Sequence, residues 1–155
     1  MATPLNIPFQ GAITKELLKL LLPDNPLIIE CGAHQGRDTL KMSKLWPMGT
    51  IHALEPVPHL FNLLKETTKN APNVRCYQQA LSATTGKQVL YVSSGASDAC
   101  SSLLKPADYF KETRITFDTT VEVDTYTLDE WCQKNSIAQI DFMWLDMQGP
   151  CEELL

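Results

Sequence analysis

Apolar positions near the start of the chain first follow a helical spacing and then run without interruption. Residues 13–22, ITKELLKLLL, place leucines three and four positions apart, which predicts a helix that Pro23 ends. The leucines that would share one face are Leu17, Leu18, Leu21 and Leu22. Residues 26–32, PLIIECG, are a short apolar run, as buried parallel strands are.

The same alternation continues to about residue 81. We expect helices at 37–46 and 59–70, and strands at 50–56 and 73–81. The second of these helices would bury Leu60, Leu63 and Leu64 on one side. Strands and helices that alternate with short links favour a parallel sheet with right-handed crossovers, the architecture of an α/β fold.

The second half of the chain mixes strands with a polar segment. Residues 86–93 have the pattern of a strand, and residues 94–110 are small, polar and loop-like. A strand then leads into a short helix with Thr127 as N-cap and Glu130 three positions on, a capping box. Residues 137–150, IAQIDFMWLDMQGP, predict a buried strand that ends at Asp146, and CEELL the first turn of a helix.

Length and charge restrict the functional classes. A chain of 155 residues fits one domain over 1–155, with 1–26 as its N-terminal helical segment. The net charge of −5 argues against nucleic acid, which needs a basic face. The longest apolar stretch is too short to cross a bilayer, and the first residues lack the pattern of a signal peptide. We therefore expect no membrane association and a cytoplasmic location.

The five cysteines are widely spaced and include no CxxC pair. This pattern predicts neither a metal site nor a disulfide framework, and reduced thiols are the simpler interpretation.

Three of the expected strands end in an acidic residue followed by a turn. These residues are Glu30, Glu55 and Asp146. In an open parallel sheet, ligands bind beyond the carboxyl ends of the strands, where the strand order reverses. The acidic residues would meet there, which makes this end of the sheet the candidate site.

The loop after the first strand has the spacing GxxxG. Gly32 can take a positive φ and allow a ligand close to the backbone, and Gly36 allows the next helix to start nearby. A GxGxxG dinucleotide loop would place glycine where this chain has His34. Glu55, 19 residues after Gly36, can accept hydrogen bonds from a ribose diol. Turn glycines without a ligand are the plain alternative.

Charge helps to choose the ligand. Glu30 beside the loop would repel the pyrophosphate of a dinucleotide. S-adenosylmethionine instead carries an ammonium and a sulfonium, which carboxylates at Glu30 and Asp146 complement. The hypothesis from the residues alone is therefore a site for S-adenosylmethionine.

Several motifs together resemble the FkbM-type methyltransferase family over roughly residues 27–150. They are IIECGAHQGRDTL, HALEPVPHLFNLLK, NVRCYQQALSATTGKQVLYV, SSLL, VEVDTYTLDEW and IDFMWLDMQG, in the family's order. The resemblance implies a Rossmann-like class I fold, a three-layer sandwich with a mostly parallel sheet. It also implies S-adenosylmethionine as cofactor and O-methylation of a hydroxyl on a small molecule or sugar.

The resemblance also implies roles for matching residues. Those around the methionine part would be Glu30, Gly32, Ala33 and Gly36, with His34 in the same loop. Glu55 would bind the ribose, Gln79 and Ala80 would lie by the adenine, and Asp146 would lie near the transferred methyl group and the acceptor. We expect Asp146 to position the acceptor, because an aspartate is a weak base at neutral pH. His34 is the other titratable candidate.

The chain departs from the family in two respects. Cys151 stands where an acidic residue is common, although Glu152 follows it. The family fold continues with further strands, so the C-terminal strands are expected to be missing, which leaves an open sheet edge and a possible homo-oligomer.

Three functional readings therefore stay open. They are a methyltransferase, a truncated non-catalytic cofactor-binding or partner-binding domain, and an NAD-dependent oxidoreductase. Asp98 with Ser101 and Ser102 fits a substrate loop and an ordinary polar loop equally well.

Overall fold

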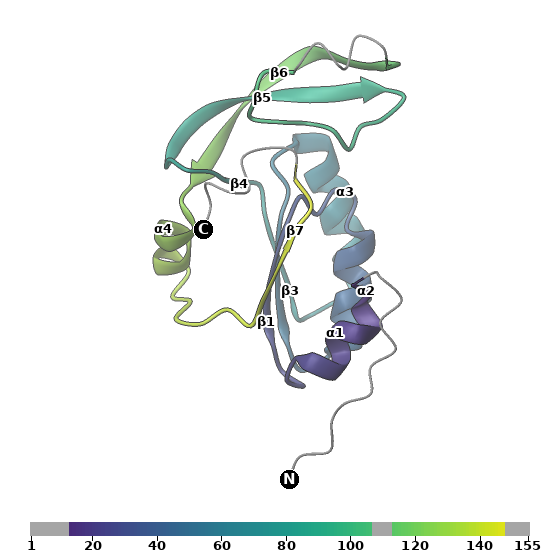
Figure 1. The fold of residues 1–155 in the computed structure, drawn as a ribbon, viewed down its shortest axis with the longest axis vertical. Helices are drawn as coiled ribbons and strands as arrows, with labels where there is room; N and C mark the ends of the chain where they lie inside the picture. The colour runs from purple at the N-terminus through teal and green to yellow at the C-terminus, as the bar shows by residue number, and fades with distance from the viewer. Residues whose placement is uncertain (1–12, 107–112, 148–155) are drawn as a thin grey trace.

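A computed structural model describes residues 13–106 and 113–147 of the chain, and Figure 1 shows their arrangement. A parallel sheet occupies the middle, helices lie on both of its faces, and a long curved hairpin crosses one end. The predicted α/β class, a Rossmann-like three-layer arrangement with a mostly parallel sheet, is confirmed.

The main sheet has four parallel strands. They are β1 (Leu27–Cys31), β2 (Thr50–Leu54), β3 (Val74–Tyr77) and β7 (Phe142–Leu145). Their order is β3-β2-β1-β7, so successive strands run outward from β1 in one direction and β7 lies on its other side. The order therefore reverses between β1 and β7, and a ligand is expected beyond the carboxyl ends of these two strands.

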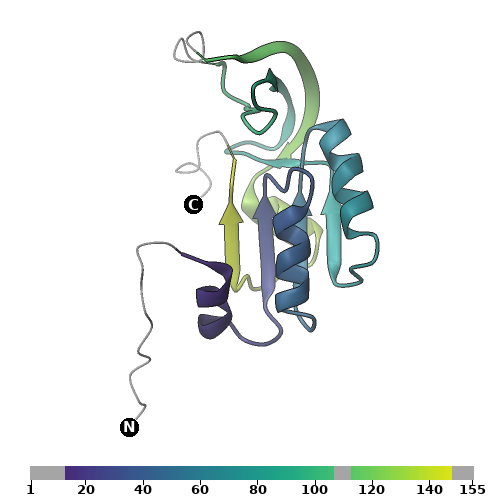
Figure 2. The same ribbon diagram turned by 90° about the vertical axis from the view of Figure 1, so that its right-hand side faces the viewer.

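Helices from the first half of the described chain cover one face of this sheet, as Figures 1 and 2 show. They are α1 (Lys15–Leu21), α2 (Arg37–Leu45) and α3 (Pro58–Thr68). The buried cluster between these helices and the sheet consists of Leu18, Ile28, Met42, Trp46 and Ile51. The predicted helix at 13–22 and the two that follow are confirmed within about two residues at each end.

Two leucines do not lie where the helical pattern put them. Leu21 is 58% exposed and Leu63 is 45% exposed, although both were expected on buried faces. Each neighbours a leucine that does pack, Leu22 in the first case and Leu64 in the second. A run of adjacent leucines marks a helix but cannot show which of them faces the sheet.

The other face of the sheet is covered by α4 (Leu128–Lys134). Trp131 of this helix is fully buried against Ile29, Leu54 and Leu81. The predicted N-cap is confirmed, because the Thr127 hydroxyl accepts a hydrogen bond from the backbone N–H of Glu130 at 3.3 Å. The second half of the predicted capping box does not form, because the N–H of Thr127 donates to Oγ1 of Thr85 at 3.0 Å.

The predicted strand at 73–81 is wrong in its extent, because the chain leaves the main sheet after β3. Residues Ala80–Leu81 form β4, which pairs with β6 (Ile115–Tyr126) in a second sheet of order β4-β6-β5. Strand β5 (Gly86–Gly95) pairs antiparallel with β6. The apolar pattern is continuous across the break, so only the change of pairing partner reveals it.

The β5–β6 hairpin lies over the carboxyl end of the main sheet (Figure 2). Leu90 and Val123 of the hairpin pack against Val57 and Leu60, which follow β2. This contact places the hairpin beside the expected ligand crevice.

The last predicted strand is also shorter than expected. Of the described residues 137–147, Phe142–Leu145 form β7, and within the described part of the chain β7 pairs with β1 alone. The expected helical turn at 151–155 and the departure at Cys151 lie outside the described residues.

Candidate functional site

Gly32 begins the loop that follows β1, and its backbone has a φ of +82°. A Cβ atom built there would lie 2.0 Å from the carbonyl oxygen of Asp146 at the end of β7. The positive φ expected from the sequence is therefore present. The backbone at the end of β7 lies against Gly32. Because glycine has no Cβ, the ends of β1 and β7 can pack this closely.

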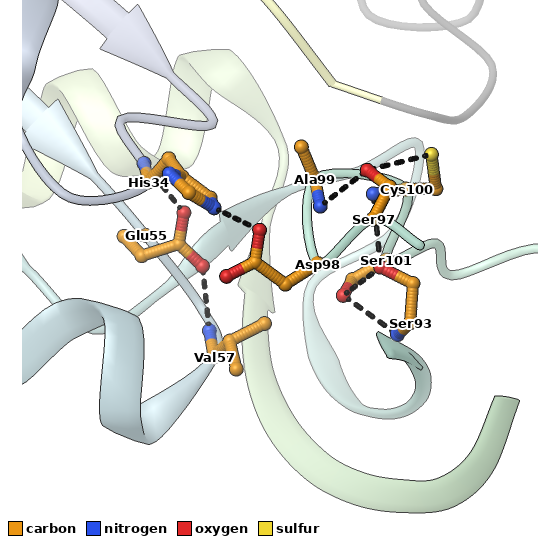
Figure 3. A network of polar contacts seen from close by, with 9 residues as sticks. All are labelled: His34, Glu55, Val57, Ser93, Ser97, Asp98, Ala99, Cys100 and Ser101. Carbon is orange, nitrogen blue, oxygen red and sulfur yellow. Dashed lines mark hydrogen bonds and ion pairs between the residues drawn. The ribbon is translucent and has the colours of Figure 1, made fainter. Parts of the chain in front are cut away.

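His34 occupies the centre of the loop with a φ of +52°, a left-handed conformation that is uncommon for residues other than glycine. Its backbone N–H donates a 2.8 Å hydrogen bond to Oε2 of Glu55, and the N–H of Val57 donates to Oε1 at 2.9 Å. Figure 3 shows Glu55 between these two segments. Glu55 thus joins the loop after β1 to the segment after β2, and His34 has a left-handed backbone conformation although it is not a glycine.

Glu55 is only 4% exposed at the end of β2. Burial raises its pKa, while the hydrogen bonds from Val57 and His34 act in the opposite direction. Each carboxylate oxygen has a second lone pair beyond the one that a backbone N–H occupies. The geometry therefore leaves room for the ribose contact expected from the sequence, which stays a prediction.

Gly36 has a different role from the other loop residues. It is the N-cap of α2 with a φ of +77°, and a Cβ atom there would lie 2.7 Å from Cδ1 of Leu64. Gly36 therefore allows α2 to pack against α3, and it is not among the residues that line either cavity described below.

Glu30 is a buried carboxyl at the end of β1, 2% exposed. The hydroxyl of Thr39 donates to its Oε2 at 2.5 Å. The pKa of Glu30 is raised to about 7, mainly because the carboxyl group is buried. The hydrogen bond from Thr39 and the charge of Lys15 lower this pKa, whereas Asp38 and Asp146 add to the rise. Glu30 is consequently poised to change its charge near neutral pH.

Two adjoining cavities lie at the carboxyl end of the sheet and share Gly32, His34, Ala99 and Asp146. The first runs along β2 toward the hairpin and is also lined by Glu55, Gln79, Ala80, Asp98 and apolar side chains that include Leu81 and Leu90. The second is also lined by Glu30, Ala33, Gln35, Arg37 and Asp38. The structure thus brings together every site residue expected from the sequence except Gly36.

Gln79 is held in place by a residue from a distant part of the chain. Nε1 of Trp131 donates a 3.0 Å hydrogen bond to Oε1 of Gln79. The Trp131 ring meets Tyr77 and His52 edge-on, at centroid distances of 5.1 and 5.5 Å. The contact of Trp131 with a cavity residue depends on the folding of α4 onto the sheet.

Asp98 is the cavity residue that the sequence left undecided. Its Oδ1 lies 2.9 Å from Nε2 of His34, which joins the segment after β5 to the loop after β1 (Figure 3). The polar composition of 94–110 was the only signal in the sequence, and it could not distinguish a binding segment from a plain loop.

Within residues 13–106 and 113–147, no three His, Cys, Asp or Glu side chains form a group that could hold a metal ion. No disulfide joins the cysteines of this part of the chain, which are Cys31, Cys76, Cys100 and Cys132. None of the helices described here has the length and apolar character needed to cross a membrane.

A parallel sheet with a positive-φ glycine loop after its first strand and a carboxylate at the end of its second defines an α/β domain of the kind that binds ribose-bearing cofactors. The chain belongs to the FkbM methyltransferase family: the family model described as "Methyltransferase FkbM domain" matches residues 30–150.

A curated relative supports the same family. The chain is 27% identical over 143 residues to a protein named 2-O-methyltransferase NoeI from Sinorhizobium fredii (strain NBRC 101917 / NGR234). The match covers 88% of this chain, and the chain spans 59% of the length of that relative.

Two solved structures show local likeness. One is a precorrin-6y C5,15-methyltransferase from Geobacter metallireducens GS-15, with a TM-score of 0.36, 24% identity and coverage of 47% of this chain and 50% of that one. The other is coclaurine N-methyltransferase bound to N-methylheliamine and SAH, with a TM-score of 0.35, 13% identity and coverage of 47% and 29%. At such scores the fold assignment rests on the sheet itself.

Proposed function

We propose that this chain is an S-adenosylmethionine-dependent methyltransferase domain that methylates a hydroxyl group of a small molecule or sugar. The match of the FkbM methyltransferase family over residues 30–150 carries the proposal. The relative's name, a 2-O-methyltransferase, supports oxygen as the accepting atom.

The charges that line the first cavity support this cofactor over a dinucleotide. The first cavity carries the carboxyl groups of Glu55, Asp98 and Asp146, and no Lys or Arg is among the described residues that line it. A pyrophosphate would be repelled there, whereas a sulfonium and an ammonium are attracted. The charge of the cavity therefore disfavours the NAD-dependent alternative. The presence of His34 where a dinucleotide loop has glycine also disfavours it.

Each residue of the site has a proposed part. Glu30, with the backbone at Gly32 and Ala33, would face the methionine end of the cofactor, because they line the second cavity. Glu55 would accept hydrogen bonds from the ribose hydroxyls. Gln79 and Ala80 would lie beside the adenine, in the cavity walled by Leu81 and Leu90.

Asp146 lines both cavities and is the residue we assign to the reaction centre. The bound cofactor would supply a methyl group on a positively charged sulfur. The oxygen of the acceptor must approach that methyl group in line, so positioning contributes most of the acceleration. Asp146 would accept a hydrogen bond from the acceptor hydroxyl and orient its oxygen.

Binding and transfer test the proposal separately. Calorimetry should show S-adenosylmethionine bound more tightly than NAD, and labelled cofactor should transfer its methyl group to members of a panel of hydroxyl compounds and sugars. Glu55→Gln should weaken cofactor binding about tenfold or more, because its amide donates where a backbone N–H now points. Glu66→Gln, an exposed change on α3, is the matched control. A preference for NAD would contradict the cofactor assignment.

The second candidate function is cofactor binding without catalysis. Tight binding of S-adenosylmethionine with no methyl transfer to any acceptor would support this reading over the enzyme.

A further inference from the structure

The segment after β5, residues 96–104, covers the first cavity and carries no role so far. We call it the cover segment. Its residues that line the cavity are Asp98, Ala99, Ser101 and Leu103. The side chain of Asp98 points from this segment toward His34 in the loop after β1 (Figure 3).

The cover segment is held against β5 by hydrogen bonds. Ser102 and Tyr91 exchange two backbone hydrogen bonds of 2.8 and 3.0 Å. The N–H of Cys100 donates to Oγ of Ser93 at 2.9 Å, and the N–H of Ser93 donates to Oγ of Ser101 at 3.0 Å. The position of Asp98 is therefore set by the fold before any ligand arrives.

Asp98 adds a negative charge to a cavity that is already acidic. Its side chain is 46% exposed, so the carboxylate lies at the border between the cavity and water. Its Oδ1 lies 2.9 Å from Nε2 of His34, and the next residue in the chain is Ala99. His34 and Ala99 line both cavities, so the carboxylate of Asp98 lies close to the place where the two cavities meet.

We propose that Asp98 is a specificity residue of the cofactor site, which favours the cationic methyl donor over its neutral product and over phosphate-bearing nucleotides. The proposal rests on the proposed function. Transfer of the methyl group removes the positive charge of the sulfur, so the attraction of Asp98 disappears and release of S-adenosylhomocysteine becomes easier. A phosphate would meet repulsion instead of attraction.

Ratios of dissociation constants distinguish this role from a purely structural one. If Asp98 only connects the cover segment to His34, its replacement should weaken the binding of every ligand by the same factor. If its charge selects the ligand, the ratio between a charged ligand and its neutral counterpart changes. The probes are S-adenosylmethionine against S-adenosylhomocysteine, and adenosine against AMP.

The experiment is calorimetry on the full chain with these four ligands. In Asp98→Asn we expect the preference for S-adenosylmethionine over S-adenosylhomocysteine to fall about tenfold, and AMP to gain several-fold relative to adenosine, because partial exposure screens the charge. Asp98→Glu, which restores the charge, should recover most of both ratios.

Asp124→Asn is the matched control. Asp124 lies on the same hairpin, is 49% exposed and pairs with Nζ of Lys87 at 3.0 Å, but does not line the cavity. Ratios that stay unchanged in Asp98→Asn, while S-adenosylmethionine still binds the wild type, would overturn the assignment of Asp98 alone. A wild-type chain that binds none of the four ligands would overturn the proposed function and this assignment together.

Discussion

At the scale of single residues, the loop after β1 depends on two unusual backbone conformations. Gly32 lies against the end of β7, and His34 is held by a side chain from the end of β2. Each contact joins a different pair of strands. The loop is therefore shaped by the strands around it as much as by its own sequence.

Replacement of Gly32 by alanine should destabilise the chain strongly. The new Cβ would meet the Asp146 carbonyl oxygen at 2.0 Å, so one of the two strands must shift. We expect a loss of about 3 kcal/mol or more in the free energy of unfolding, from overpacking together with backbone strain. Urea denaturation measures it.

Gly86→Ala separates the two causes. Gly86 also has a positive φ, +148°, but a Cβ there meets nothing within 4 Å. Gly86→Ala should lower the free energy of unfolding by about 1 to 2 kcal/mol, from backbone strain alone. Equal losses in the two variants would show that the approach of Asp146 is unimportant.

Glu30 should make stability depend on pH. The folded chain holds this proton up to about pH 7, whereas an unfolded chain releases it near the ordinary value of 4.5. The free energy of unfolding should therefore fall by roughly 3 kcal/mol on account of this group as the pH rises between these values. Glu30→Gln removes the penalty and keeps an acceptor for Thr39.

The measurement is urea denaturation at pH 5 and pH 8. Glu30→Gln should be more stable than the wild type at pH 8, with a smaller gain at pH 5. Glu66→Gln, exposed on α3, should show no such change. A gain that is independent of pH would contradict a titrating Glu30.

At the scale of elements, the short helix α4 covers the face of the sheet opposite α1, α2 and α3, and it also contacts the site. Trp131 fills the core on that face and its indole N–H reaches Gln79 on the cavity wall. The helix itself was predictable from its capping residues. Its contact with residue 79 required the turn that sends β4 into the second sheet.

Trp131→Phe should therefore affect ligand binding as well as stability. The change keeps most of the ring packing but leaves Oε1 of Gln79 without its donor, at a cost of about 1 kcal/mol or more. We expect S-adenosylmethionine to bind several-fold more weakly, measured by calorimetry.

Trp46→Phe is the counterpart on the other face of the sheet. Nε1 of Trp46 is buried and has no hydrogen-bond partner among the described residues, so the substitution removes an unsatisfied donor. It should leave cofactor binding unchanged. Equal weakening in both variants would indicate a general packing effect and no specific role of Gln79.

At the scale of the whole molecule, β7 is an edge strand of the main sheet within the described part of the chain. All four of its residues, Phe142–Leu145, are only partly buried although they are apolar. The homo-oligomer expected from the sequence stays a proposal, in which this edge pairs with a second copy.

Light scattering after size exclusion should then give a mass that increases with concentration. Hydrogen exchange provides a local readout, because amides of β7 should become more protected as the chain associates. The central strand β2 is the internal control, since its neighbours already pair with both of its edges. A constant monomer mass at all concentrations would contradict association.

The sequence by itself determined the order of elements, the acidic strand ends and the glycine loop. Helical and strand spacing come from local geometry, and the apolar runs around Ile28, Ile51 and Leu64 carry that signal directly. The positions of Glu30, Glu55 and Asp146 followed from the rule that parallel strands end on the same side.

Only the tertiary structure decided which residues meet across long separations. Three such contacts are the pairing of β4 with β6, the hydrogen bond of Trp131 to Gln79 and the pairing of His34 with Asp98. Each joins segments that are far apart in the chain. Such contacts depend on which strand pairs with which and on how the hairpin lies over the sheet. Local spacing carries no information about either, because the same apolar pattern is compatible with several partners.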